Sequence, residues 1–108
     1  MLNLLHPAFN SKENVIKLNK NNTIEHELAK ALICIEAMER GVDFVSEAVF
    51  ENGKRADVFL LQDEEAIEIV KTESKKSIEK KHKDYPVDIR ALKADYILKV
   101  WKERLAQW

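Results

Sequence analysis

The chain has 108 residues and a net charge of −1, with 45% apolar and 34% charged residues. These values are typical of one soluble globular domain, and they exclude a strongly basic protein, so contact with nucleic acid requires a local basic patch. The lone cysteine, Cys34, excludes an internal disulfide and a cysteine zinc cluster. No apolar run approaches the ~20 residues that span a bilayer, and residues 1–10 lack a signal-peptide pattern, so we expect a cytoplasmic protein without membrane contact.

Residues 1–22 are expected to be irregular, because they hold six asparagines and Pro7. A helix is predicted to follow and to end at Gly41, with Asn22 as its N-cap and Glu25 completing a capping box. Its apolar residues recur at helical spacing in a stripe on one face. The opposite side, with Ala29, Ile33, Cys34 and Ala37, is partly apolar too, so we expect the helix to be largely buried. The stripe consists of Ile24, Leu28, Ala31, Leu32, Ile35 and Met38.

Three strands are expected next. Residues 42–50 form the first, and the Asn-Gly pair within residues 51–54 indicates a hairpin turn. Residues 56–61 and 66–70 are short apolar runs separated by a polar cluster, which is typical of two buried antiparallel strands. The first three strands therefore predict an antiparallel meander.

One acid interrupts each of the last two runs, Asp57 in the first and Glu68 in the second. If residues 63–64 form a two-residue loop, these acids lie on one face as diagonal neighbours, roughly 7–8 Å apart at Cα. Two carboxylates at that separation can share one divalent cation, whereas a one-residue slip would place them on opposite faces. The alternative is that either acid lies at a strand end in water, or pairs with Arg55 or a lysine.

A basic stretch follows the strands. Residues 71–83 carry six lysines and two glutamates, and we expect them to form a second helix that ends before Pro86. Lys75, Lys76 and Lys80 are the candidate contacts to DNA phosphates, although an ordinary solvated helix face would have the same composition.

The remaining elements are a fourth strand at residues 87–92 and a final helix at residues 94–108. Ile97, Trp101, Leu105 and Trp108 share one face of that helix. The order helix, three strands, helix, strand, helix predicts a single α/β (α+β) domain over residues 1–108. In it a mixed four-stranded sheet is flanked by helices on both faces.

This order, together with HELAKAL at 26–32, RAD at 55–57, AIEIV at 66–70 and the following KTES, resembles the PD-(D/E)XK nuclease superfamily. These nucleases have a restriction-endonuclease-like core. The closer resemblance, over residues 22–92, is to small archaeal Holliday junction resolvase-like and competence-protein-like members. It implies that Asp57 and Glu68 bind Mg²⁺ or Mn²⁺, with Glu27, or as second choice Glu25, adding a metal contact.

The chain departs from the family pattern at the lysine expected two residues after the second acid, where it has Val70. Lys71 can take that catalytic role if a bulge turns it inwards, and Lys30 is the other candidate. The resemblance implies a metal-dependent DNA endonuclease that works as a homodimer, with structure-specific cleavage of junctions as one form of this activity. Two alternatives remain: an inactive relative that only binds nucleic acid, and an oligomeric assembly protein that uses the helix of Trp101 and Trp108.

Overall fold

The computed structural model describes residues 4–7, 10, 12–71 and 85–107. Its elements are α1 (Ile24–Glu39), β1 (Phe44–Val49), β2 (Arg55–Leu60), β3 (Glu65–Val70), β4 (Asp88–Lys93) and α3 (Ala94–Leu105). The expected α+β fold with a four-stranded mixed sheet is therefore confirmed. The helix expected at residues 72–85 falls almost entirely outside the described residues.

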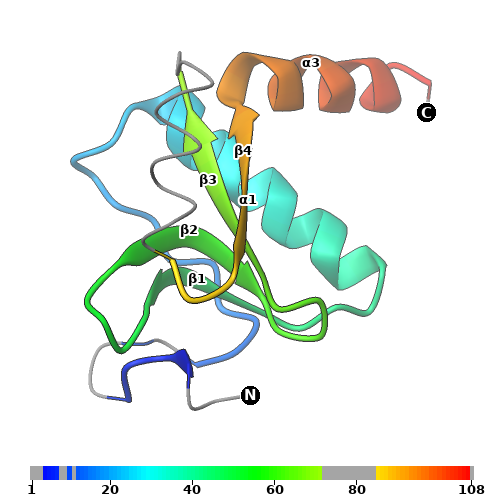
Figure 1. Ribbon diagram of the computed structural model, residues 1–108. Coiled ribbons are helices and arrows are strands. Elements are labelled where there is room, and N and C mark those ends of the chain that lie inside the picture. Colours follow the sequence, from blue (N-terminus) through cyan, green and yellow to red (C-terminus); the bar gives the residue numbers. More distant parts are fainter. Residues whose placement is uncertain (1–3, 8–9, 11, 72–84, 108) are drawn as a thin grey trace.

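The four strands form one sheet in the order β1-β2-β3-β4 (Figure 1). The pairs β1–β2 and β2–β3 are antiparallel, whereas β4 runs parallel to β3. In the described part of the N-terminal segment, Leu5 forms a bridge to Phe50 beside β1.

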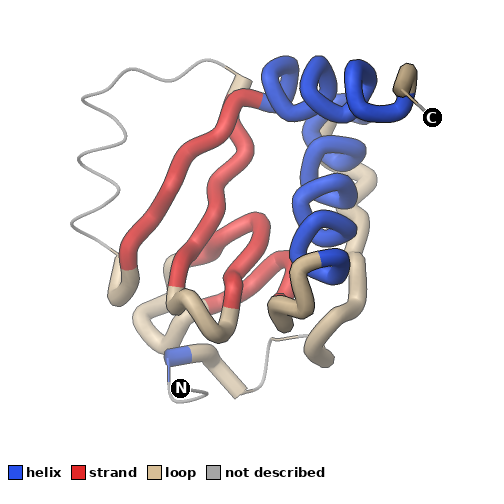
Figure 2. Tube along the Cα trace, turned by 90° about the vertical axis from the view of Figure 1, so that its right-hand side faces the viewer, coloured by secondary structure: helices blue, strands red, loops and turns tan. Residues whose placement is uncertain are grey.

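Both described helices lie on the same face of the sheet, here called the helix face (Figure 2). The core beneath them is formed by residues of α1 and α3 and by Phe44, Val58, Leu60, Ile67 and Ile69. A second core lies on the far face, where Leu5, Tyr85 and Val87 pack against the sheet. The expected covering of both faces by helices is therefore not confirmed, and the helix predicted at residues 72–85 lies almost entirely outside the described residues.

The face of α1 that packs on the sheet is not the stripe of large apolar residues. The expectation of a largely buried helix was wrong for that stripe, because Ile24 is 82% exposed and Leu28 and Met38 are also exposed. The buried residues are Ala29, Lys30, Ile33, Cys34 and Ala37. Small side chains dominate this buried face, so the helix can approach the strands closely. The N-cap is Thr23 rather than Asn22, since its hydroxyl accepts a hydrogen bond from the His26 N–H at 3.1 Å.

Cys34 lies in this tight contact between α1 and the sheet. Its side chain is fully buried, and burial raises the pKa of the thiol to about 12. Cys34 is therefore a residue of the core beneath α1.

The loop between β2 and β3 is longer than predicted. Leu60 pairs with Glu65, so residues 61–64 form the connection and the expected two-residue loop was wrong. Leu61 is only 5% exposed and its N–H bonds to the Asp43 carbonyl at 2.9 Å. Because Leu61 packs in the core away from the β2–β3 ladder, the two strands separate sooner than expected, and Glu64 turns the chain with φ of 49°.

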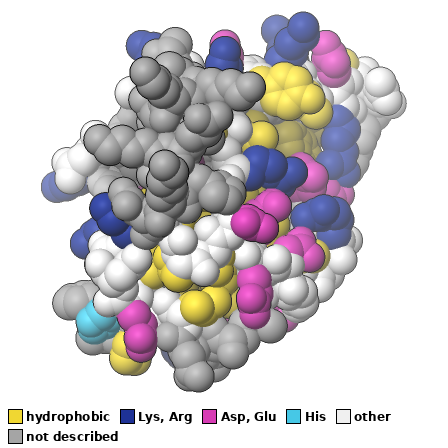
Figure 3. Space-filling model, viewed as in Figure 1, with side chains coloured by type: hydrophobic (Ala, Val, Ile, Leu, Met, Phe, Trp, Pro, Cys, Tyr) yellow, Lys and Arg dark blue, Asp and Glu magenta, His cyan; other side chains and the backbone are white. Residues whose placement is uncertain are grey.

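The last helix packs through fewer residues than expected. Ile97 is buried and Trp101 is half-buried beneath the guanidinium of Arg104, but Leu105 is 55% exposed and Trp108 lies outside the described residues. Arg104 also pairs with Glu39 of α1 at 2.5 Å. Acidic and basic side chains are intermixed on the right-hand side of Figure 3, with apolar side chains among them. Neither described helix has the length and apolar character needed to cross a bilayer.

Candidate functional site

Strands β1 and β2 share an irregularity that places two acids opposite each other. Glu47 has a left-handed φ of 51°, a conformation that is strained for any residue other than glycine. On both sides of it the pairing keeps one register, with Ser46 opposite Val58 and Ala48 opposite Ala56. Val58 nevertheless belongs to the helix-face core and Ala56 to the far-face core, so the alternation of side chains breaks at Glu47 and Asp57. Both acids consequently contact groups of α1.

Lys30 of α1 is buried against the first of these acids. Its side chain is 0% exposed, and its ammonium lies 2.6 Å from Glu47 Oε1 and 2.7 Å from Glu27 Oε1. Burial alone would lower the pKa of Lys30, but the hydrogen bonds to the two glutamates outweigh it and raise this pKa above its usual value. Lys30 is therefore a permanent internal cation, bonded to one acid of the helix and one of the sheet.

Glu27 has a donor at each of its two oxygens. Oε1 accepts hydrogen bonds from Lys30 and from the Asn19 N–H, while Oε2 accepts from the ring of His26 at 2.8 Å and from the Asn22 amide at 3.2 Å. Burial would raise the pKa of Glu27, but these four hydrogen bonds outweigh it and lower the pKa from 4.5 to about 2. Glu27 is thus ionised at neutral pH and fully occupied.

The charge of Asp57 is stabilised by fewer hydrogen bonds than that of Glu27. Its Oδ2 accepts a 2.7 Å hydrogen bond from the Ile69 N–H, and its Oδ1 lies 3.4 Å from Nε2 of His26. Burial raises the pKa of Asp57, because lost solvation and the nearby Glu47 charge outweigh the Ile69 hydrogen bond and the attraction of His26 and Lys30. A buried carboxylate of this kind favours a nearby proton or cation.

His26 connects the acids to solvent. Because Glu27 is ionised, its Oε2 accepts a hydrogen bond from the Nδ1–H of the ring, which leaves Nε2 facing Asp57. The side chain is 21% exposed, and its 3.4 Å contact with Asp57 is too long for a strong hydrogen bond. No catalytic role for His26 was expected from the sequence. In the fold, Asn19 and Asn22 before α1 bond to the Glu27 carboxylate that also bonds to the His26 ring.

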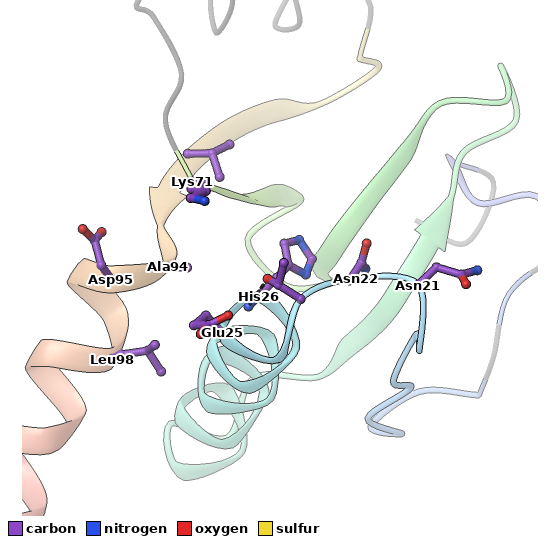
Figure 4. A pocket seen from close by; sticks show the side chains of 10 residues that line it. Asn21, Asn22, Glu25, His26, Lys71, Ala94, Asp95 and Leu98 are labelled. Carbon is purple, nitrogen blue, oxygen red and sulfur yellow. Dashed lines mark hydrogen bonds between the residues drawn. The ribbon is translucent and has the colours of Figure 1, made fainter.

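A pocket of about 580 Å³ opens in front of His26, here called the His26 pocket (Figure 4). It lies where the first turns of α1 and α3 approach the end of β3. Its lining includes Asn21, Asn22, Thr23, Glu25, His26, Val70, Lys71, Ala94, Asp95 and Leu98. The wall combines two helix N-termini and the exposed Lys71 with the acids Glu25 and Asp95. The pocket therefore brings cationic and N–H groups, together with carboxylates, next to the His26 ring.

The predicted site residues are only partly brought together. Glu68 belongs to the far face, because Ile67 and Ile69 on either side of it belong to the helix-face core, and it accepts a 2.9 Å hydrogen bond from the Tyr85 hydroxyl. Asp57 instead contacts α1, where the ring of His26 lies between it and Glu27 and contacts both. Lys71 lines the His26 pocket. Lys75, Lys76 and Lys80 lie outside the described residues.

The predicted metal ligands have the oxygen donors that Mg²⁺ prefers. In the described part of the chain, however, no group of three His, Cys, Asp or Glu side chains is placed to hold a metal ion. Glu27 is occupied by four donors and Glu68 is bonded to Tyr85, whereas Asp57 Oδ1 has no ion pair shorter than 3.4 Å among the described residues. The trio Asp57, Glu68 and Glu27 does not fit one metal ion in this arrangement, and Asp57 remains the candidate ligand.

A scan against models of protein families finds no match, and searches of curated proteins and of solved structures find no significant one. The nuclease family therefore stays a prediction from the residues.

Proposed function

We propose that this protein is a DNA-cleaving phosphodiesterase whose reaction takes place in the His26 pocket. The observation that carries the proposal is the position of His26. Glu27 orients its ring through Nδ1, and Nε2 is presented beside Asp57 to a pocket that Lys71 also lines. A base held by a carboxylate, with a lysine and helix N-termini nearby, is one arrangement that can support hydrolysis of a phosphodiester.

The chemistry follows from these groups. Nε2 of His26 accepts a proton from a water molecule, whose oxygen forms the new bond to phosphorus. The bond from phosphorus to the departing deoxyribose oxygen breaks, and that oxygen takes a proton from solvent. Lys71 and the N–H groups of the two helix N-termini stabilise the negative charge on the phosphoryl oxygens. Lys71 would thus supply the cation that the family pattern expects at Val70, from an exposed position at the end of β3.

The test is incubation of the protein with branched, single-stranded and duplex DNA, each with Mg²⁺, with Mn²⁺ and with EDTA. Cleavage of at least one substrate is expected, with a loss of at least about tenfold in rate for His26→Asn and for Lys71→Met. Lys99→Met is the matched control, since Lys99 is an exposed lysine of α3 outside the pocket lining. Wild-type protein that cleaves nothing, or a His26→Asn variant with full rate, would contradict the proposal. The EDTA samples separate a cation requirement from chemistry done by His26 alone.

A second candidate is DNA binding without cleavage. Lys30 favours it, because its ammonium already bonds to both Glu27 and Glu47, in the position where a metal ion would join these two acids. This candidate predicts DNA binding by the wild-type protein together with the absence of cleavage under every condition.

A further inference from the structure

A second hollow lies beside the His26 pocket, between the segment at residues 17–21 and the start of β2. It has a volume of about 410 Å³ and is here called the basic cleft. Three cations line it, Lys17, Lys20 and Arg55, together with Leu18, Asn19, Asn21, Glu47 and Val49. The only acid among the described lining residues is Glu47, whose carboxylate is bonded to Lys30. The cleft is therefore positive although the whole chain has a charge of −1.

The three cations are available to a ligand. Among the described residues, none of the side chains of Lys17, Lys20 and Arg55 has an acidic partner within ion-pair distance. All three residues are exposed, which contrasts with the buried and doubly bonded Lys30. An unpaired cation in a concave surface attracts anions more strongly than one on a flat surface, because low-dielectric walls focus its field.

The walls that carry these cations are fixed by hydrogen bonds. The Lys17 N–H donates to the Ser46 hydroxyl at 2.8 Å, and that hydroxyl donates to the Val15 carbonyl at 2.6 Å. Farther along, the Asn19 N–H bonds to Glu27 and the Asn21 N–H to Asn19 Oδ1 at 3.0 Å. The segment is thus held against β1 and α1 without a helix or strand of its own, so a ligand does not have to order it.

The cleft and the His26 pocket are neighbours that share the lining residue Asn21. A strand bound in the cleft would therefore pass Asn21 on its way to the His26 pocket. The amide groups of Asn19 and Asn21 add neutral donors along the same path, as is common in sites that contact sugar and phosphate oxygens.

We propose that the basic cleft binds the phosphodiester backbone of one nucleic-acid strand and leads it to the His26 pocket. This inference rests on the proposed function in taking nucleic acid as the ligand. It places backbone contacts at Lys17, Lys20 and Arg55, in addition to the basic stretch at residues 71–83. Contacts of this kind give affinity that depends on salt and not on base sequence.

The test is fluorescence anisotropy with a labelled single strand of about 20 nucleotides, in EDTA and at salt concentrations of about 50 to 200 mM. The Lys17→Ala/Lys20→Ala variant is compared with Lys99→Ala/Lys102→Ala, which removes the same charge from the exposed side of α3. Each lost phosphate contact lowers the salt slope by about 0.7, so the cleft variant is expected to lose about 1.4 units and the control none. Arg55→Gln is expected to lose about 0.7. Circular dichroism of each variant checks the fold.

The outcomes separate the two proposals. Equal slopes for the cleft variant and its control would overturn the cleft while leaving cleavage at His26 untouched. Wild-type protein that binds no oligonucleotide would overturn both. Inorganic phosphate added at millimolar concentration provides the last comparison: displacement of the strand by phosphate at equal affinity would show a site for small anions and overturn the backbone assignment.

Discussion

Replacing Lys30 by methionine tests whether the buried ammonium holds α1 to the sheet. The side chain is fully buried, and its two ion pairs of 2.7 and 2.6 Å join Glu27 and Glu47. Methionine fills a similar volume but leaves both carboxylates without their cation. Breaking a buried ion pair from one side costs about 3–5 kcal/mol, a large fraction of the about 5–15 kcal/mol that stabilise a domain of this size.

Urea unfolding followed by circular dichroism measures this loss. With a slope of about 2 kcal/mol per molar urea, the midpoint for Lys30→Met is expected to fall by about 2 M. Lys102→Met on the exposed side of α3 is the control and is expected to change stability by less than about 0.5 kcal/mol. The variant Lys30→Met/Glu27→Gln/Glu47→Gln removes the uncompensated charges and is expected to recover most of the loss. A loss below about 1 kcal/mol for Lys30→Met, or a triple variant as unstable as the single one, would refute the reasoning.

Three further predictions concern charge. The folded-state pKa of Glu27 is lowered from 4.5 to about 2, so its stabilisation is full above pH 4.5 and is lost as the pH falls toward 2; Glu27→Gln is expected to flatten the unfolding free energy over that window in acid titrations. The pKa of Asp57 is raised by burial, so the ionised form destabilises the fold at neutral pH; Asp57→Asn is expected to match or exceed the wild-type stability at pH 7, with the difference vanishing below the ordinary value of 3.8, and a lower melting temperature at pH 7 would contradict this. On duplex DNA, replacing Lys75, Lys76 and Lys80 by alanine is expected to lower the salt slope of binding by up to about 3 units, and an unchanged slope would mean that these lysines are only solvated.

The strands could be predicted well from the sequence, whereas the face of α1 that packs on the sheet could not. The difference is in how many packing arrangements each segment allows. Short apolar runs such as residues 56–61 have few alternatives to a buried strand, and the Asn-Gly turn defines the hairpin before them. In α1 both sides carry apolar residues, and the larger ones, Ile24 and Leu28, suggested the core side. The sheet selected the smaller side instead, where Ala29 and Ala37 allow close approach.

The candidate site depended on features that a pattern does not encode. Glu47 adopts a positive φ although it is not glycine, and this conformation turns it toward Lys30. The loop after β2 has four residues because Leu61 packs in the core, which changes the residue opposite Asp57. Asp57 could be identified from the sequence as an acid inside an apolar run. Its partner His26 could not, because their contact depends on how α1 packs against β2.

The reactivity of Cys34 can report the separation of α1 from the sheet. The thiol is fully enclosed and its pKa of about 12 keeps it protonated, whereas only an exposed thiolate is alkylated at an appreciable rate. It is also the single cysteine of the chain, so any label reports this one position. The rate at which an alkylating reagent modifies the native protein therefore measures how often the contact between α1 and the strands opens. Lys30 lies one turn before Cys34 on the same buried side. Loosening of its contacts with Glu27 and Glu47 would therefore make labelling of Cys34 faster before the protein unfolds as a whole.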